Sequence, residues 1–324
     1  MKTLSGVLVI VFMLLIFPLT GGFSFEGPFQ IKNLYPIFLH AGQPYLEKAA
    51  MENSMSYSLS HSSTYTVQRS ADWIISLDME ATELAFRYKR MIKDHVEFDM
   101  DIPVLIIGGG FMDGFLEDYH NSFGFPDYGR SDRPNNDFLY EIKDRKDGTL
   151  FIKGKSGIRI GDIRLGLKKP LITSDGFEIS IKGDVEIPVG NAKQGYGNGS
   201  VDALISVLLD KKITDRIMTH WNIGGVFPGD VKGHEKIELD DFIFGGAAIE
   251  ADLGRGFSLL LQVQGQSSIY PETDLLAVDR EAWLLAFGGR YQKGKRSFDL
   301  SLTEDINRSG APDFILNLAY KMNL

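Results

Sequence analysis

Cysteine is absent from this sequence of 324 residues. The chain can therefore be neither a disulfide scaffold nor a lipoprotein anchored through a lipidated cysteine. Basic residues are outnumbered, with 34 Lys and Arg against 43 Asp and Glu and a formal net charge of -9. Because phosphate contacts need clustered Lys and Arg, this acidic balance excludes nucleic acid as an expected partner.

Long apolar runs are also lacking. After residue 25 no stretch reaches the roughly 18 consecutive apolar residues of a membrane helix, which argues against a helical membrane protein. A closed barrel is the other structure that crosses a bilayer, because each strand pairs its backbone polar groups with its neighbours. Barrel strands are only half apolar, so they leave no hydropathy peak and remain compatible with this sequence.

The first residues have the layout of a secretory signal peptide. A positive start at Lys2 precedes an apolar run over 7–19, and small residues follow up to Ser24. The run is shorter than the about 20 residues that a spanning helix needs. We therefore predict a signal peptide over 1–24, cleaved after Gly22 or Ser24. An uncleaved membrane anchor is the alternative.

Alternation of apolar and polar residues is the main signal in the rest of the chain. It is clear in 96–104, in 174–189 and in the terminal run 314–324. A soluble β-sandwich alternates too. However, the 174–189 run exceeds the about five or six residues usual in soluble sheets, and aromatic residues gather at strand ends, as in the girdles of membrane barrels. The sequence thus predicts an all-β fold, a transmembrane antiparallel up-and-down β-barrel.

Short polar turns alternate with long loops, which orders the expected strands and leaves both chain ends in the periplasm. The twelve strands lie near 53–62, 72–90, 95–106, 158–170, 175–189, 200–210, 215–227, 240–252, 257–267, 281–292, 296–304 and 313–324. They predict a barrel over 51–324 with a long external loop at 107–135 that carries a short helix. The region 136–157 leaves two alternatives: a hairpin inside that loop, or two more spanning strands and fourteen in all. The apolar phase of the second strand slips between Met79 and Thr82, which predicts a β-bulge.

Residues 25–50 do not fit the strand pattern. Pro28, Pro36 and Pro44 exclude a regular interior strand, yet the segment is rich in apolar side chains that need burial. Two alternatives follow from this composition. The segment either folds into the lumen as a plug or forms a loosely ordered periplasmic arm.

The stretch 107–130 carries unusual chemistry. Its three consecutive glycines lack both a GxGxxG spacing and a Walker lysine, so we do not interpret them as a phosphate loop. Asp113, Glu117 and His120 follow at helical spacing, and Arg130 ends the stretch. Three roles are open: a hydrolase centre that pairs His120 with a serine and a carboxylate, a metal site completed by a further ligand, or a structural set of hydrogen bonds at the barrel mouth. The structural role is favoured, so no catalytic residue, metal or cofactor is predicted.

The run DGFLEDYHNSFGFP, followed by Arg130, resembles the signature of the domain-of-unknown-function 3187 family, predicted outer-membrane proteins of Gram-negative bacteria. GPFQIKNLYP at 27–36, Asp-Met-Glu at 78–80 and the stretch 161–165 also fit that family. The resemblance covers most of the mature chain. It implies an outer-membrane location and a barrel architecture, and it implies no settled activity. Leu324 departs from the aromatic residue that ends many outer-membrane barrels.

Charged residues on the polar faces of the strands are expected to line the lumen, because charges at membrane depth are costly when they face lipid. If their signs pair across the lumen, the barrel is closed and rigid. If the signs segregate, a charged path crosses it and small polar solutes can pass. The expected lumen-facing charges are Arg87, Glu97, Asp99, Asp101, Arg164, Glu178, Lys182, Asp184 and Glu186.

The leading functional hypothesis is an outer-membrane barrel of Gram-negative bacteria that acts as a channel, a transporter or a structural membrane component, with no catalysis. Its expected partners are outer-membrane lipid and lipopolysaccharide, the outer-membrane assembly machinery and a small-molecule cargo of unknown identity. Two alternatives come from other classes of protein. One is an outer-membrane hydrolase that uses the His120 loop, and the other is a secreted β-sandwich that binds a ligand.

Overall fold

The computed structural model describes most of the chain after the predicted signal peptide. The described residues are 25–38, 41–42, 44–114, 118, 133–307, 310–312 and 314–324. In this part of the chain no helix is long and apolar enough to cross a membrane.

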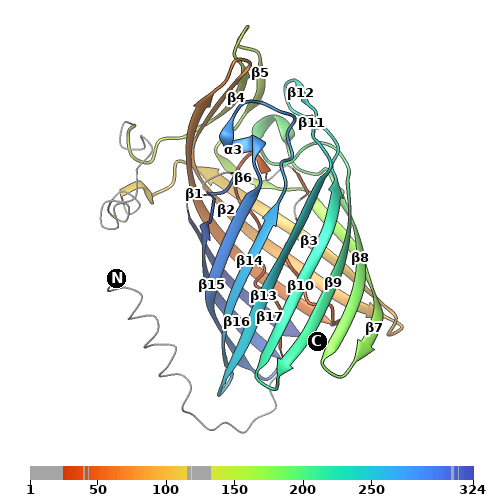
Figure 1. Ribbon diagram of the computed structural model, residues 1–324. Coiled ribbons are helices and arrows are strands. Elements are labelled where there is room, and N and C mark those ends of the chain that lie inside the picture. Colours follow the sequence, from red (N-terminus) through yellow and green to blue (C-terminus); the bar gives the residue numbers. More distant parts are fainter. Residues whose placement is uncertain are drawn as a thin grey trace.

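Twelve long strands form one closed antiparallel barrel (Figure 1). Each strand pairs with its neighbours in sequence, and β1 pairs with β17 to close the ring, beginning with Ser54 opposite Asn323. The prediction of a transmembrane up-and-down barrel is confirmed, and a two-sheet sandwich is wrong. The barrel strands are β1 (Ser54–Arg69), β2 (Trp73–Ile92), β3 (Val96–Gly108), β7 (Ile163–Ser174), β8 (Phe177–Ile187), β9 (Asp202–Thr214), β10 (Ile217–Phe227), β13 (Phe242–Gly254), β14 (Phe257–Gln266), β15 (Ala282–Lys293), β16 (Arg296–Asp305) and β17 (Phe314–Asn323).

The alternative of fourteen spanning strands is wrong. The region 136–157 forms the hairpin β4 (Leu139–Asp144) and β5 (Leu150–Lys153), and β4 pairs with the first residues of β2, which project beyond the ring at the loop end. The short β6 (Gly157–Ile160) likewise pairs with the end of β3. Strands of four to six residues are too short to cross a bilayer, which takes about 9–11 residues.

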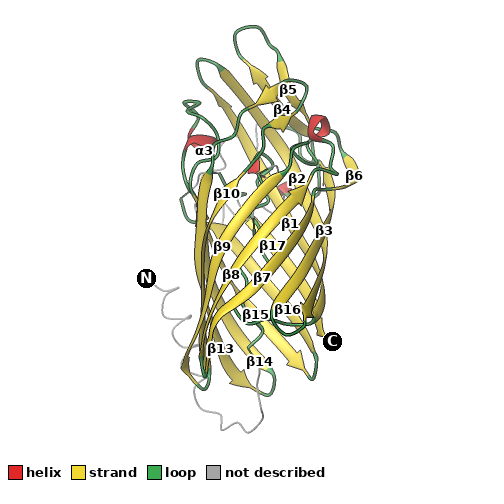
Figure 2. Cartoon of the chain, turned by 90° about the vertical axis from the view of Figure 1, so that its right-hand side faces the viewer, coloured by secondary structure: helices red, strands yellow, loops and turns green. Residues whose placement is uncertain are grey.

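The two ends of the barrel differ (Figure 2). At the turn end, where β17 ends, tight turns join the strands, and the turn from β13 to β14 places Arg255 and Gly256 at φ 53 and 83, as a type I′ hairpin turn requires. At the opposite loop end, long connections carry η3 (Ala192–Gln194), β11 (Val231–Lys232), β12 (Lys236–Ile237) and α3 (Leu276–Asp279). The helix expected within 107–135 falls largely on residues outside the described part.

The predicted β-bulge in β2 is wrong. Its pairing with β1 runs in unbroken register across Met79 and Thr82, and its pairing with β3 is unbroken from Glu80 onward. The odd-numbered residues of β2 point inward throughout, but the interior changes along the strand. Leu77 and Met79 pack in an apolar core near the loop end, whereas Arg87 lies among charges near the turn end. The apolar pattern therefore slips because the barrel interior is apolar at one end of the strand and charged at the other. The backbone register does not shift.

The outer face of the barrel is apolar and ends in aromatic pairs near the turn end. The rings of Phe257 and Tyr291 lie side by side in a tilted arrangement with centroids 4.7 Å apart, and those of Phe298 and Tyr320 have centroids 4.9 Å apart. Large apolar side chains between the girdle and the loop end are exposed, including Ile223 at 65%. Such a belt matches the lipid-facing surface of a transmembrane barrel.

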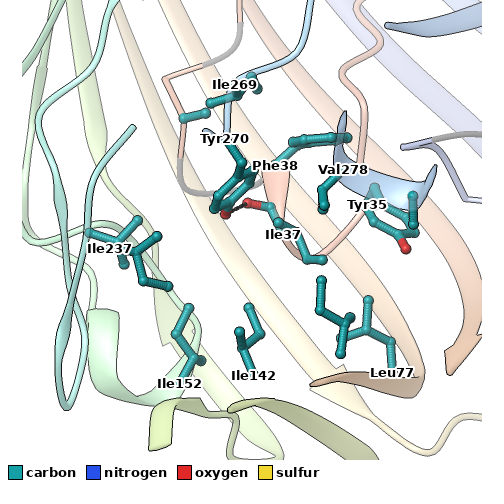
Figure 3. Packing of buried hydrophobic residues seen from close by; sticks show 14 of the residues in the cluster. Tyr35, Ile37, Phe38, Leu77, Ile142, Ile152, Ile237, Ile269, Tyr270 and Val278 are labelled. Carbon is teal, nitrogen blue, oxygen red and sulfur yellow. Dashed lines mark hydrogen bonds between the residues drawn. The ribbon is translucent and has the colours of Figure 1, made fainter. Parts of the chain in front are cut away.

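The interior of the loop-end half is a conventional hydrophobic core (Figure 3). Tyr35, Ile37 and Phe38 of the N-terminal segment fill its centre, and the hydroxyl of Tyr270 donates a hydrogen bond of 2.8 Å to the carbonyl of Ile37. Side chains from the strand ends and from the loops close around them, among them Ile142. The core thus ties the N-terminal segment to the loops.

Replacing Leu318, which is 46% exposed at mid-strand on β17, with Arg tests whether the outer face contacts lipid. The Leu318→Arg variant should lose about 2–4 kcal/mol of folding free energy in lipid vesicles, because the guanidinium would face acyl chains. Urea titration of the vesicle-inserted protein measures the loss. Leu324→Arg is the control, since the chain terminus lies at the girdle and should cost about 0–1 kcal/mol. Equal small losses in both variants would contradict a lipid-facing surface.

Candidate functional site

The N-terminal segment, residues 25–53, runs through the interior of the barrel. Phe29, Ile31 and Leu34 are fully buried. Its prolines preclude a regular β-ladder. Side chains of the barrel wall therefore form hydrogen bonds with backbone N–H groups of the segment. The N–H of Phe29 donates to Gln262 Oε1 at 2.8 Å, and the N–H of Glu47 donates to Asn222 Oδ1 at 2.7 Å.

Carboxylates of the wall hold both ends of this segment. Glu250 Oε2 accepts the N–H groups of residues 26 and 27, at 3.2 and 3.1 Å. Asp210 Oδ2 accepts those of residues 49 and 50, at 2.9 and 3.2 Å. His220 lies between the two carboxylates, with Nδ1 2.6 Å from Asp210 Oδ1 and Nε2 3.9 Å from Glu250 Oε2. The same three side chains therefore connect the two attachment points.

Glu47 is the centre of the charged half of the lumen. Its two carboxylate oxygens contact Lys89 Nζ and Lys182 Nζ, each at 2.5 Å. Lys182 also contacts Asp99 at 3.1 Å and Asp184 at 2.9 Å. Burial alone would raise the pKa of the Glu47 carboxyl, but the ammonium groups of Lys182 and Lys89 outweigh it and hold that pKa well below its ordinary value. Glu47 thus remains ionised and links β2 to β8.

A second group of ion pairs lies at the turn end. Lys321 of β17 contacts Glu26 at 2.8 Å and Glu52 at 2.5 Å, and Lys48 contacts Glu52 at 2.7 Å. Lys168 pairs with Glu97 at 2.9 Å and donates hydrogen bonds to the carbonyls of residues 48 and 50. Charges of the segment and of the wall alternate here, so each charge has an opposite neighbour.

Arg87 joins the segment to the wall at the boundary with the apolar core. Its guanidinium carbon lies 4.0 Å from the centre of the Tyr45 ring, a cation–π contact. Nη1 donates to Gln30 Oε1 at 2.7 Å, and Nε lies 3.5 Å from Asp101. Lys32 of the segment contacts the same Asp101 at 3.4 Å. A small cavity of about 30 Å³ lies between Lys32, the wall and the loop end, with room for about one water.

Comparison with known proteins assigns the chain to a family. The family described as "Protein of unknown function (DUF3187)" matches residues 4–324. The chain belongs to this DUF3187 family. No curated protein matches the chain significantly.

Among solved structures, the chain of this DUF3187 protein is similar to the COG4313 outer membrane channel from Pseudomonas putida F1. The two chains share 13% identity over 85% of this chain and 96% of the other, with a TM-score of 0.55. The NanC porin shares 8% identity over 83% of this chain and 100% of its own, with a TM-score of 0.49. At these identities the first similarity concerns the fold alone.

The DUF3187 barrel brings most of the predicted lumen charges together. Glu178 is half-buried near the turn end, and the other charges are buried inside, where they pair by sign instead of segregating. Arg164, for example, donates to Glu186 at 3.0 Å. The buried members are Arg87, Glu97, Asp99, Asp101, Arg164, Lys182, Asp184 and Glu186.

The predicted loop set is only partly described. Asp113 accepts a hydrogen bond of 2.6 Å from the N–H of Asn136, so it anchors the loop. Glu117, His120 and Arg130 lie outside the described residues. Among the described residues, no three His, Asp or Glu side chains are arranged to hold a metal ion.

Sequence reasoning missed the charges of the N-terminal segment itself, of which Glu47 and Glu52 make the closest contacts. It also missed Arg290 on β15, which pairs with Asp299 at 2.7 Å and Glu250 at 3.0 Å. Arg290 follows the inward period of its strand, so the alternation already carried that signal. The partners of Glu47 come from strands distant in sequence, which no local pattern reveals.

Glu47→Gln tests the centre of the lumen network. The substitution keeps the volume of the side chain but leaves two buried ammonium groups without their shared carboxylate, so the barrel should lose about 3–5 kcal/mol of stability. Urea unfolding of the vesicle-inserted protein measures the change. The control is Glu238→Gln, because that side chain is 75% exposed beside Lys236 and should contribute little. Equal effects in the two variants would contradict the central role of Glu47.

The contribution of Glu47 should also depend on pH. Its folded-state pKa lies below the ordinary value of 4.5, so its stabilising effect is complete above that value and is lost as the pH falls through the lower folded pKa. The stability difference between wild type and Glu47→Gln should therefore be constant from pH 8 to about 5.5 and shrink in stronger acid. Unfolding series at several pH values test this. A difference that grows below about pH 4 would contradict the depressed pKa.

Proposed function

We propose that this protein is an outer-membrane channel of Gram-negative bacteria for small polar solutes, closed at rest by its own N-terminal segment. The supporting observation is that the described residues of 25–53 occupy the lumen without joining the β-sheet. They are held by ion pairs and by side-chain hydrogen bonds, such as those of Glu47 with Lys89 and Lys182. Contacts of this kind can be exchanged for water and solute without breaking the barrel ladder.

The wall behind the segment suits a polar solute. Displacing the segment would expose acidic and basic side chains of β2, β3, β7 and β8, including Asp101, Lys168 and Lys182. Both signs are present, so the lumen favours neither anions nor cations by net charge alone. A barrel of twelve strands has a lumen intermediate between a filled eight-stranded barrel and a wide porin. We infer a cargo that carries several hydrogen-bonding groups and is narrow enough to pass between them.

Location and partners follow from the same surfaces. The apolar belt with its aromatic girdle supports contact with outer-membrane lipid, with lipopolysaccharide on the outer leaflet. Insertion of such a barrel would require the outer-membrane assembly machinery. The name of the COG4313 outer membrane channel agrees with this proposal for a protein of similar fold.

A disulfide between the segment and the wall tests whether the segment closes the lumen. Because the sequence has no native cysteine, the introduced pair has no competing thiols. Ser180 Oγ donates to the carbonyl of Ala49 at 2.8 Å, so the Ala49→Cys, Ser180→Cys double variant should link the segment to β8. In planar bilayers we expect low conductance from the oxidised protein and a severalfold higher conductance after reduction. The single Ser180→Cys variant controls for the reductant. Identical conductance in the oxidised and reduced states would contradict displacement of the segment, and silence in both would favour a structural role.

A further inference from the structure

A polar group interrupts the apolar outer face of the barrel on β1 and β2. Outward positions alternate along these strands, and near the turn end they hold Tyr57 and Leu84. Towards the loop end the next outward positions hold His61 and Thr82, which face each other across the pair, and then Glu80 opposite Ser63. Ionisable side chains thus occupy outward positions that usually hold apolar residues in lipid-facing strands.

These residues lie at the loop-end edge of the apolar band, where the pairing of β1 with β17 ends at Ser63 and that of β2 with β3 ends at Glu80. On the other side of β1, His61 pairs with Leu316 of β17, and Ser63 pairs with Phe314. On the other side of β2, Thr82 pairs with Ile106 of β3. The polar group is therefore bordered by apolar residues along both neighbouring strands. Placing an ionisable side chain at membrane depth costs free energy. Such residues usually mark a functional site, where they pair with another polar group.

The three side chains form a chain of contacts. His61 Nδ1 lies 2.7 Å from Thr82 Oγ1, and His61 Nε2 lies 3.1 Å from Glu80 Oε2. When the ring proton is on Nε2, which faces the Glu80 carboxylate, Nδ1 is left to accept the proton of the Thr82 hydroxyl. This is the order of a nucleophile, a base and an orienting acid.

The beginning of the loop after β3 fixes the acid and covers the base. Glu80 Oε1 accepts the N–H groups of Phe111 and Met112, at 2.8 and 2.5 Å. The ring of Phe111 stacks on His61 with centroids 5.3 Å apart and planes inclined by 14°, yet it is 75% exposed. Gly110 adopts φ +73, and a Cβ there would lie 1.8 Å from the Glu80 carboxyl carbon. The backbone approach thus requires glycine, and it presents an apolar ring to the lipid beside the polar group.

We propose that Thr82, His61 and Glu80 form an acyl-transfer centre on the outer wall that hydrolyses a fatty acyl ester of a membrane lipid. The Thr82 hydroxyl attacks the ester carbonyl carbon while His61 Nδ1 takes its proton. The lipid alcohol then leaves with that proton, and the acyl group stays on Thr82 Oγ1. Water attacks the acyl-threonine with the same proton transfers and releases a fatty acid. Glu80 is a positioning residue that stabilises the imidazolium.

The location of the centre selects the class of substrate. The wall faces lipid, the flanking Leu316 and Ile106 can contact acyl chains, and the exposed Phe111 extends that apolar surface. An ester lies where the acyl chains of a lipid meet its polar part, and an edge of the apolar band such as this one would lie near that boundary. Phospholipid and lipopolysaccharide both carry such esters. The three side chains face outward and take no part in the lumen of the proposed channel.

The test is the release of fatty acid by the full mature protein in detergent micelles, measured by mass spectrometry. One arm supplies diacyl phosphatidylethanolamine and the other supplies lipopolysaccharide. We expect release in one arm and a loss of at least 100-fold in Thr82→Val and in His61→Gln. Thr173→Val, at an exposed position near the turn end of β7, should leave the rate unchanged. Heat-modifiable mobility on gels verifies that each variant is folded.

Two further measurements separate chemistry from structure. Glu80→Gln should lower kcat and leave KM nearly unchanged, because the carboxylate orients His61 and stabilises the imidazolium that forms only during the reaction. A long-chain alkyl fluorophosphonate should label Thr82 in the wild type and not in His61→Gln. No fatty acid from either lipid, equal rates in Thr82→Val and wild type, or labelling at Ser63 instead would each overturn the assignment.

Discussion

The structure depends on one constraint: inside a bilayer every backbone N–H and C=O group must find a partner within the protein. The ring meets it by closing, and the closing pair β1 and β17 brings the first and last strands side by side over ten residue pairs from Ser54 and Asn323 onward. Closure has a second effect. Each strand then has one face towards lipid and one towards an enclosed interior, so alternation in the sequence becomes sidedness in space. The enclosed interior must then be filled either by protein or by water.

This barrel fills its interior with its own N-terminal segment. The segment contributes different side chains to the two halves of the lumen. Near the loop end it contributes aromatic and aliphatic side chains such as Phe38, and near the turn end it contributes Glu47 and Glu52, whose carboxylates lie between lysines of different strands. Buried ion pairs are seldom a large net gain over apolar packing, but losing one partner is costly. In the proposed channel, a plug held in this way would be stable in place and would be released when water replaces its contacts.

Much of the fold could be predicted from the sequence because alternation is a local signal. Twelve strands and the short turns follow from period-two patterns and turn residues, and the inward side of Asp99 follows from the same parity. Glu47 could not be placed, since its position depends on Lys89 and Lys182, which lie 42 and 135 residues away. The bulge predicted in β2 failed for a related reason. The slip in the apolar pattern was interpreted as an irregularity of the backbone. It instead reflects a change in the polarity of the surroundings along the strand.

That change on β2 links the two faces of the wall. In the loop-end half, Leu77 and Met79 point into an apolar interior, and the outward Asp78 and Glu80 contact Arg133 and the start of the loop after β3. In the turn-end half the pattern is reversed, with Arg87 inside and Phe86 outside. An outward carboxylate is compatible with membrane depth only where protein covers it. The inversion therefore locates the place on the outer wall where the start of the loop after β3 covers the Glu80 carboxylate, next to the contact between His61 and Thr82.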